Sequence, residues 1–299
     1  MPARLAVGVV SAGRVGTALG QALSRAGHVV TACTAVSDAS IARAARRLPD
    51  ARILPPPDVA TTSDLLVLAV PDTELPGLVR GLAACDSVRP GTIVLHTSGA
   101  HGIAILEPLT SAGARPLAVH PAMTFIGTDE DTARLPNACF GITAADPLGY
   151  AIGQGLVLEV GGEPVAVSEE DRALYHAALA HGANHLVTLV ADAVAALRDA
   201  LRGNELLGQE IVGDDPRGLP ERVIAPLLSA ALDNVLRHGR GALTGPVARD
   251  DAETVARHLA ALAETDPRIA ESYRTLALRT AQTAGAGAEM FDVLEGGRS

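Results

Sequence analysis

Short, nearly continuous apolar runs alternate with helix-like segments through the first half of this 299-residue chain. Runs this apolar are typical of strands that are buried on both faces, as in a parallel sheet covered by helices. The alternation predicts an α/β fold with an open, doubly wound parallel sheet. The expected strands are Arg4–Val10, His28–Thr34, Asp64–Val70, Thr92–His96, Ala114–His120 and Ala138–Ile142, and the expected helices are Val15–Ala26, Ile41–Leu48, Ile103–Ala112 and one beginning near Pro147, with a loop at Pro55, Pro56 and Pro57.

The second half of the chain changes character after about Val167, where strand-like runs give way to long helical patterns. Ser168, followed by three acidic residues, resembles the capped start of a helix that continues to Leu201. The sequence therefore predicts an N-terminal Rossmann-type domain over residues 1–165 and a C-terminal all-helical domain over residues 166–299. Further helices are expected at Pro220–Arg237, Asp251–Glu264 and Pro267–Thr283.

The chain contains no lysine, so all 24 of its Lys+Arg residues are arginines. A Schiff-base enzyme and a Walker A phosphate loop are thereby excluded, because both need a lysine amine. A hydride-transfer mechanism with a lysine acid is excluded for the same reason.

The formal net charge of -10 and an aromatic content of 2% argue against nucleic-acid binding. No apolar run reaches the ~20 residues of a membrane span. The three scattered cysteines build no disulfide framework and no metal site, so a reducing cytoplasm is expected.

The first expected strand runs into a glycine pattern that is typical of dinucleotide binding. The pattern G-x-G-x-x-G appears with Ser11 at its first position and Gly13 and Gly16 at the others, around Arg14 and Val15. Gly13 would let the backbone approach a pyrophosphate, and Gly16 would let the helix pack on the strand. The helix N-terminus would then offer free N–H groups to the phosphates. Because the first glycine normally makes the tight turn, Ser11 leaves the loop conformation open.

The residues after the second expected strand favour NADP(H) over NAD(H). An NAD enzyme usually carries an acidic residue there for the ribose 2′-hydroxyl. This chain instead has Ser37 and Ser40, followed by Arg43. Small hydroxyls and an arginine suit a 2′-phosphate. Asp38 is counter-evidence, although it can instead cap the next helix, and arginines at this place can equally form a solvated helix face.

Polar residues at the carboxyl ends of the strands are the next candidates, because ligands of open α/β sheets bind there. His96 and His120 each end an apolar run, where an imidazole can transfer a proton. Alternatively, His96 only caps a strand and His120 only shapes a turn. Ser98 can bind the nicotinamide carboxamide or the substrate, or be an ordinary turn residue. The residues expected to contact the cofactor at this edge are Val70, Pro71, Ser98 and Gly99.

The long helix carries polar residues on one face. His176, Ala180 and Asn184 follow one another at i, i+4 and i+8. His181 and His185 have the spacing of a zinc pair, but the glutamate of H-E-x-x-H is missing, so no metal is expected.

A second polar cluster lies in the loop before the helix expected at Asp251. It contains Thr244, in a Thr-Gly-Pro turn, and Arg249. Asp250 with Glu253 resembles a capping box. An arginine at a helix entrance can hold a carboxylate through two parallel hydrogen bonds, or it can form an ion pair with Asp250 or Asp251 that pins the loop. Ser98, Thr244 and Arg249 are therefore the candidate substrate-binding residues.

Six strings occur in one order along the chain: SAGRVG, AVPD, HTSG, AVHPAMTF, YHAALAHGANHLVTL and ALTGPVARDD. Together they resemble a bacterial family of Rossmann-like proteins with a characteristic C-terminal helical domain, and the resemblance extends from Ala6 to about Thr280. This family is similar to ketopantoate reductases, pyrroline-5-carboxylate reductases and β-hydroxyacid dehydrogenases. The chain departs from the family at Ser11, and at Asp251, where a glycine is usual nearby.

The resemblance implies an NADP(H)-dependent oxidoreductase of a small carboxylate substrate, whose helical domain binds substrate and forms a homodimer. The relatives present a lysine and, one turn later, an asparagine from the long helix. Here Asn184 is retained and Ala180 stands at the lysine's place, so His176, His120 or water must supply the proton.

Three functions stay open. The first is reduction of a small 2-oxo acid, with ketopantoate (2-dehydropantoate) as the leading substrate. The second is reduction of a cyclic imine of the pyrroline-5-carboxylate type, which already carries its proton. The third is NADP binding without catalysis, as a sensor or scaffold.

Overall fold

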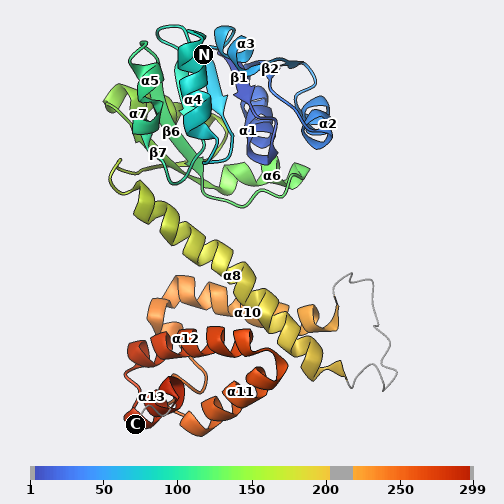
Figure 1. Ribbon diagram of the computed structural model, residues 1–299, viewed down its shortest axis with the longest axis vertical. Helices are drawn as coiled ribbons and strands as arrows, with labels where there is room; N and C mark the ends of the chain where they lie inside the picture. Colours follow the sequence, from blue (N-terminus) through green and yellow to red (C-terminus); the bar gives the residue numbers. More distant parts are fainter. Residues whose placement is uncertain (1–3, 203–217, 297–299) are drawn as a thin grey trace. The chain divides into compact units, whose positions relative to one another are not determined.

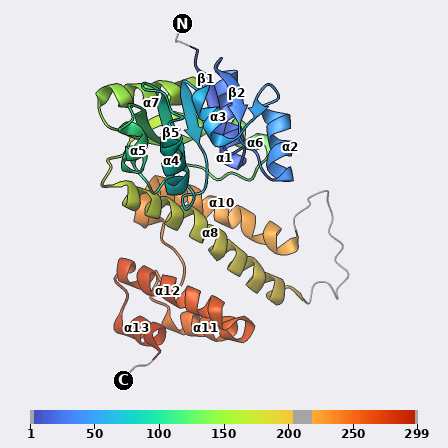
Figure 2. The same ribbon diagram turned by 45° about the horizontal axis from the view of Figure 1, so that its top comes forward.

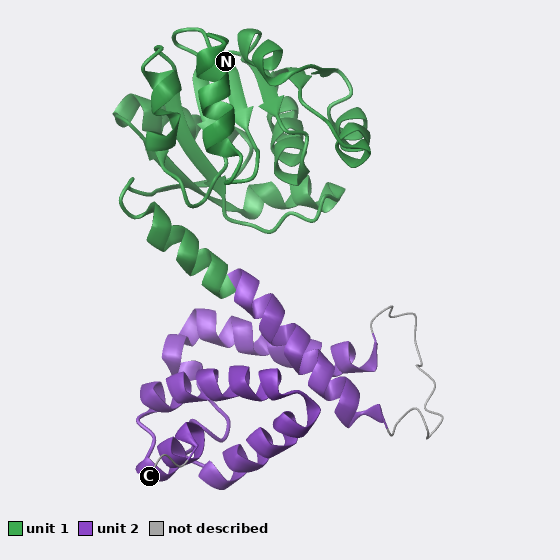
Figure 3. Ribbon diagram, viewed as in Figure 1, with its two compact units in different colours: residues 1–182 green, residues 183–299 purple. Residues whose placement is uncertain are grey.

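The computed structural model describes residues 4–202 and 218–296 (Figure 1), and the chain divides into two compact units, residues 1–182 and 183–299 (Figure 3). The first unit is built on one eight-stranded sheet of order β3-β2-β1-β4-β5-β6-β7-β8. Neighbouring strands are parallel except β6 and β7, which are antiparallel. The expected doubly wound sheet is confirmed. Its strands are β1 Ala6–Val10, β2 Val29–Cys33, β3 Arg52–Ile53, β4 Leu65–Leu68, β5 Ile93–His96, β6 Arg115–Pro121, β7 Cys139–Ala144 and β8 Glu163–Ala166.

Two apolar cores lie on the two faces of this sheet, because successive side chains of a strand point to opposite faces. In β4, Leu65 and Val67 belong to one core, while Leu66 and Leu68 belong to the other. Helices α1 and α7 contribute to the first core, and α3, α4 and α5 contribute to the second. The helical segments of this unit are α1 Arg14–Arg25, α2 Asp38–Arg47, α3 Pro56–Thr61, α4 Leu75–Ala84, η1 Ile103–Leu106, α5 Glu107–Thr110, α6 Asp129–Arg134, η2 Leu135–Asn137 and α7 Pro147–Glu159.

Three features of this unit differ from the sequence prediction. The proline segment is not all loop, since Pro56 begins α3; proline fits the first turn of a helix, where its missing N–H would have no partner. The segment expected as one helix from Ile103 is a 3₁₀ turn followed by a single α-helical turn. Strands β3 and β8 were not predicted, because they are largely exposed edge strands and so have no apolar run in the sequence.

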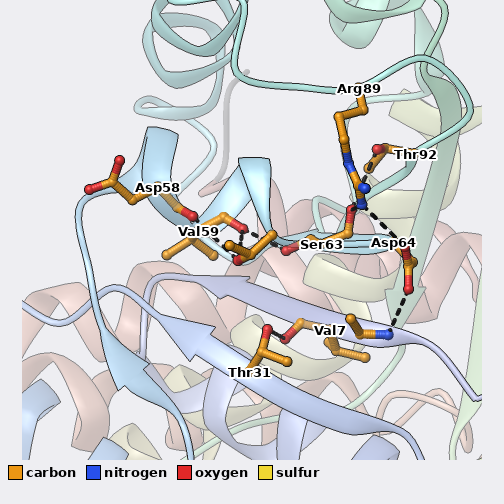
Figure 4. Close-up of polar contacts among 10 residues, drawn as sticks. Val7, Thr31, Asp58, Val59, Ser63, Asp64, Arg89 and Thr92 are labelled. Carbon is orange, nitrogen blue, oxygen red and sulfur yellow. Dashed lines mark hydrogen bonds and ion pairs between the residues drawn. The ribbon is translucent and has the colours of Figure 1, made fainter.

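Polar contacts join the amino ends of the central strands (Figure 4). The Asp64 carboxylate, just before β4, accepts hydrogen bonds from the Ala6 backbone N–H (3.0 Å) and from Arg89 (3.2 Å). Arg89 also donates to the backbone oxygen of Ser63 (2.9 Å). These contacts tie β1, β4 and the approach to β5 together at the end of the sheet opposite the carboxyl ends of its parallel strands.

The second unit is helical in its described part. Helices α11, α12 and α13 lie side by side in both views (Figures 1 and 2) and share an apolar core. The helices α8 and α10 contribute little to any core: the fully buried residue on α8 is Arg172, and that on α10 is Pro220. No helix in the described residues is long and apolar enough to cross a membrane. The segments are α8 Arg172–Ala200, which begins in the first unit, α10 Leu219–His238, η3 Gly239–Ala242, α11 Ala252–Thr265, α12 Pro267–Ala284 and α13 Ala288–Glu295.

Candidate functional site

The glycine-pattern loop joins β1 to α1 at the carboxyl edge of the sheet. Ser11 has a φ of 81°, the left-handed conformation that a glycine would adopt without strain. Two bonds hold it there: the Ser11 N–H donates to Oγ1 of Thr34 (2.6 Å), and the Ala12 N–H donates to the Thr34 backbone oxygen (2.7 Å). The loop thus makes the tight turn although serine replaces the first glycine.

Gly13 and Gly16 bring the start of α1 close to the sheet. A Cβ atom on Gly16 would overlap the backbone oxygen of Ser11 and lie 3.1 Å from the Cβ of Ala69. Gly13 is the N-cap of α1 and supplies no side-chain bond to the first N–H groups of the helix, where Arg14 and Val15 lie. Such a helix end suits an anion, because the free N–H groups and the helix dipole both favour negative charge.

A cavity of about 640 Å³ opens beside this loop. Arg43 is the cationic side chain among the residues that line it, and Glu74 is an acidic one. Arg43 is half-buried and donates from Nε to the backbone oxygen of Ala12 (3.3 Å). The lining includes six of the residues predicted to bind the cofactor, namely Ser11, Gly13, Ser37, Ser40, Arg43 and Val70. The volume, the open helix end and the arginine fit an adenine dinucleotide with an additional phosphate.

Ser37 and Ser40 form a reciprocal capping box at the start of α2. The Ser37 hydroxyl accepts from the Ser40 N–H (3.2 Å), and the Ser40 hydroxyl accepts from the Ser37 N–H (3.0 Å). The cap of this helix is therefore Ser37 and not Asp38, which is the first residue of the helix. Each hydroxyl already accepts a hydrogen bond from the backbone N–H of the other serine. Arg43 is therefore a stronger candidate than either serine to bind a phosphate.

His96 lies at the end of β5 with both ring nitrogens engaged. Its Nδ1 accepts from the Ser98 N–H (3.2 Å), and its Nε2–H donates to the backbone oxygen of Gly102 (2.8 Å). Burial lowers the pKa of His96 to about 4, so the ring is neutral. Ser98 is also buried, and its hydroxyl accepts from the His101 N–H (3.2 Å). This geometry supports the alternative in which His96 caps the end of the strand.

His120 and His176 meet over the backbone of Gly99. Their rings lie edge to face with centroids 5.9 Å apart. A Cβ atom on Gly99 would lie 2.5 Å from Cδ2 of His176 and 3.0 Å from Nε2 of His120, so only glycine leaves room for both imidazoles. The structure thus brings together two predicted catalytic residues and a predicted cofactor contact.

The environment of His120 opposes protonation. Burial is the main cause that lowers its pKa to about 4, His176 and Arg172 contribute less in the same direction, and Asp72 has the opposite effect. His120 is therefore a neutral imidazole near pH 7. It can donate one hydrogen bond and accept another, but it carries no extra proton.

Two residues that the sequence did not single out complete this cluster. The Tyr175 hydroxyl lies 3.1 Å from Nδ1 of His120. Arg172, which is 1% exposed, donates to the backbone oxygens of Ala118 (2.8 Å) and Gly141 (3.0 Å). Tyr175 adjoins the predicted His176 in sequence, which was a usable signal. Nothing in the sequence indicated Arg172, because an arginine in the first turn of a helix is usually exposed to solvent.

Asn184, Thr244 and Arg249 belong to the second unit and are all exposed within it. Thr244 lines cavities of about 590 and 810 Å³ in that unit. The described structure contains no ion pair of Arg249 with Asp250 or Asp251.

The helix after Arg249 is capped by a different aspartate from the one predicted. The cap is Asp251, whose carboxylate accepts from the Thr254 N–H (3.0 Å). Asp250 has a φ of 59° and accepts instead from the Gly287 N–H at 3.0 Å. The loop is thus anchored by Asp250 and Asp251, and Arg249 between Ala248 and Asp250 is exposed. Among the described residues, no group of three His, Cys, Asp or Glu side chains is placed to hold a metal ion.

Comparisons with known proteins agree with this architecture. Residues 1–121 match a Rossmann-like domain, and residues 138–280 match a domain of unknown function, DUF2520. The chain carries a Rossmann-like domain and a DUF2520 domain. This confirms the resemblance carried by the six strings to Rossmann-like proteins with a C-terminal helical domain. No curated protein matches the sequence.

Solved structures extend the likeness in fold over nearly the whole chain. A Bacteroides fragilis protein provisionally assigned as an NADP oxidoreductase is 20% identical, with a TM-score of 0.76 over 93% of this chain and 98% of its own. An imine reductase from Myxococcus stipitatus in complex with NADP⁺ is 16% identical, with a TM-score of 0.65 over 98% and 100%. The NADP-bound pyrroline carboxylate reductase of Plasmodium falciparum is 12% identical, with a TM-score of 0.56 over 94% and 98%.

Proposed function

We propose that the protein is an NADPH-dependent reductase of a small carboxylate substrate, with a 2-oxo acid as the preferred class and ketopantoate as the first substrate to test. The observation that carries the proposal is the pair of imidazoles over Gly99, at the sheet edge that also holds the glycine-pattern loop and its cavity. The three solved structures described above are of proteins named as NADP oxidoreductases or reductases, and two hold NADP.

NADPH would be held by residues of three segments. The N-terminus of α1, from Gly13 to Gly16, would bind the pyrophosphate, and Arg43 would bind the 2′-phosphate. Val70, Pro71, Ser98 and Gly99 would contact the cofactor along the strand ends. When bound, the reduced nicotinamide supplies a hydride.

The two histidines would divide the work at the substrate carbonyl. His120, which is neutral, would donate a hydrogen bond to the carbonyl oxygen and polarise it. His176 would supply the proton that the developing alkoxide needs. Asn184 would orient the carbonyl, and Arg249 would hold the substrate carboxylate with its fork of donors.

A cyclic imine is the second candidate substrate, and the low pKa of His120 favours it. A protonated imine needs no acid in the reduction step, and this chain has no lysine to provide one. Incubation of the protein and NADPH with a panel of 2-oxo acids and cyclic imines, followed by NADPH absorbance, separates the two. Tight NADPH binding without turnover of any member would support a non-catalytic sensor or scaffold instead.

We also propose that the protein is a cytoplasmic homodimer. Several apolar side chains of α8 and α10 are exposed, among them Val187 (68%), Leu227 (67%) and Leu236 (78%). Monomers rarely leave such a patch in water, and a second copy of the same helices would cover it. The three cysteines are unpaired, which suits a reducing compartment.

A further inference from the structure

Tyr175 is the nearest polar partner of the ring that the proposed function places at the substrate. Its hydroxyl lies 3.1 Å from Nδ1 of His120, and the two rings are edge to face with centroids 5.7 Å apart. A Cβ atom on Gly141 would lie 2.6 Å from the same hydroxyl, so the phenol is seated directly on the backbone of β7. The tyrosine is thus held from two sides, by a strand and by a histidine.

The contacts of the Tyr175 hydroxyl indicate which group donates the hydrogen bond. Burial raises the pKa of the Tyr175 phenol, and the nearby positive charge of Arg172 lowers it. That charge stabilises negative charge on the phenol oxygen, so it favours the arrangement in which the phenol is the donor. The hydroxyl proton is then free to be donated to Nδ1 of His120. An imidazole that accepts at Nδ1 carries its single proton on Nε2. In His120, Nε2 is the nitrogen beside Gly99.

Arg172 contacts the tyrosine ring and adds to the effect of burial, which is the main reason that His120 is neutral. Its guanidinium lies 5.7 Å from the centroid of the Tyr175 ring, a cation–π distance. It is tied to both antiparallel strands, through Ala118 on β6 and through Gly141 and Thr143 on β7. Its Nη1 is buried without a hydrogen-bond partner among the described residues. A second proton on His120 would place another positive charge beside it.

We infer that Tyr175 is a positioning residue that holds His120 in the neutral form with its proton on Nε2, supported by Arg172. The inference rests on the proposed function, because it gives His120 the donor that a carbonyl oxygen at the Gly99 edge would require. Without the tyrosine hydroxyl, the imidazole would divide between its two neutral forms, and only one of them presents a proton at Nε2.

The decisive variant is Tyr175→Phe, which removes the hydroxyl and keeps the ring. Two-bond ¹H–¹⁵N NMR spectra of histidine-labelled protein report the protonated nitrogen directly. Wild-type protein should show His120 protonated on Nε2, and Tyr175→Phe should show a mixture of both forms. His258, whose Nδ1 lies 3.0 Å from the hydroxyl of Tyr273, serves as an internal reference that should not change. An unchanged His120 signal in the variant, or an Nδ1–H form in the wild type, would overturn the inference.

Kinetics give the second readout. Loss of one neutral hydrogen bond should lower kcat about 3- to 10-fold, with KM and NADPH affinity unchanged. Tyr150→Phe, on α7 with its ring against the core of the same unit, is the control and should leave kcat unchanged. A higher KM with an unchanged kcat would instead assign Tyr175 to substrate binding and would overturn the positioning role.

The design separates this inference from the proposed function. If wild-type protein reduces none of the panel substrates, the proposed function fails, while the NMR spectra still decide the tautomer. If Tyr175→Phe does not fold, Gly141→Ala provides the same test, because its Cβ would displace the hydroxyl without straining the backbone. An unshifted His120 tautomer in Gly141→Ala would then count against the inference.

Discussion

Arg43 donates a hydrogen bond from Nε to the backbone oxygen of Ala12 (3.3 Å), so a guanidinium from α2 lies against the loop that joins β1 to α1. Replacing Arg43 with Ala should weaken NADPH binding by about 1–3 kcal/mol, the range for hydrogen bonds to a charged group. NADH binding should hardly change, because NADH lacks the 2′-phosphate. Fluorescence titration of each reduced cofactor measures both dissociation constants.

Arg46→Ala is the matched control for this prediction. Arg46 lies on the same helix, is exposed and pairs with Asp129 at 3.3 Å. NADPH affinity should be unchanged in that variant. An equal loss of NADPH and NADH binding in Arg43→Ala would mean that Arg43 only supports the loop at Ala12. Wild-type protein that binds NADH as tightly as NADPH would contradict the cofactor assignment itself.

Gly99→Ala should displace the two imidazoles that meet over this residue. The new Cβ would lie 2.5 Å from Cδ2 of His176 and 3.0 Å from Nε2 of His120, and at least one ring must move. Turnover of the substrate identified by the panel should fall by at least ~10-fold, which corresponds to about 1.4 kcal/mol of lost transition-state binding. Steady-state kinetics of the purified variant provide the measurement.

Gly81→Ala supplies the comparison, because no atom lies within 4 Å of a Cβ at that position in α4. That variant should keep full activity and gain stability, since alanine favours a helix over glycine. If Gly99→Ala turned over substrate as fast as Gly81→Ala, the imidazole pair would not be the catalytic site.

The stability of the fold should decrease in mild acid. The pKa values of His96 and His120 are each lowered to about 4 from the ordinary 6.5, chiefly by burial. Between these values the unfolded chain binds protons that the folded chain does not, so stability is full above about pH 6.5 and is lost as the pH falls towards 4. Each histidine should contribute a slope of up to about 1.4 kcal/mol per pH unit.

Denaturant unfolding at intervals from pH 7 to pH 5 tests this dependence, because most carboxylates stay ionised there. His120→Gln should reduce the slope by about one proton and leave the contribution of His96. A slope that is the same in wild type and variant would show that His120 is protonated in the folded protein, contrary to its burial beside Arg172.

The sheet could be predicted from the sequence because its central strands are buried on both faces. Such strands must be apolar throughout, as Leu65–Leu68 is, and they are therefore visible in the sequence. The edge strands Arg52–Ile53 and Glu163–Ala166 escaped prediction because exposed backbone pairing leaves no apolar pattern. The glycine-pattern loop could also be predicted, because a side chain at Gly16 would overlap the backbone oxygen of Ser11 and the position must therefore be glycine.

The environment of the catalytic candidates was less predictable. His120 was found because it ends an apolar run, but its low pKa comes chiefly from burial, to which His176 and the buried Arg172 add. Arg172 lies 52 positions later in the chain and donates hydrogen bonds to the backbone of β6 and β7. Sequence spacing cannot show that an arginine is buried. Asp250 was predicted as the cap of α11, but the cap is Asp251, for a similar reason. The carboxylate of Asp250 accepts a hydrogen bond from Gly287, which is distant in sequence.

Leu227→Glu should convert the proposed dimer into monomers. Leu227 lies on α10 with 67% of its surface exposed, and a carboxylate buried between two copies would cost far more than the leucine contributes. Sedimentation equilibrium should give the mass of one chain for the variant and of two for the wild type. Leu158→Glu, on α7 of the first unit with 58% exposed, should stay dimeric. Monomeric wild-type protein at micromolar concentration would contradict the proposal.

Arg249→Lys should lower kcat/KM on the true substrate by at least ~10-fold, about 1.4 kcal/mol, without changing the melting temperature. A small acid that approaches a protein of net charge -10 needs a local cation, and arginine is the only basic side chain here that stays charged at any working pH. The loop does not need the guanidinium, because the backbone of Asp251 bonds to the Pro246 oxygen (2.9 Å) and the Asp250 carboxylate bonds to Gly287. Lysine keeps the charge but cannot form two parallel bonds to a carboxylate. Arg257→Lys, on α11 with Thr254 as its partner, is the control for exchanging an arginine in the same unit. A variant with unchanged kcat/KM would remove Arg249 from the substrate site, whereas a lower melting temperature would assign it to the loop.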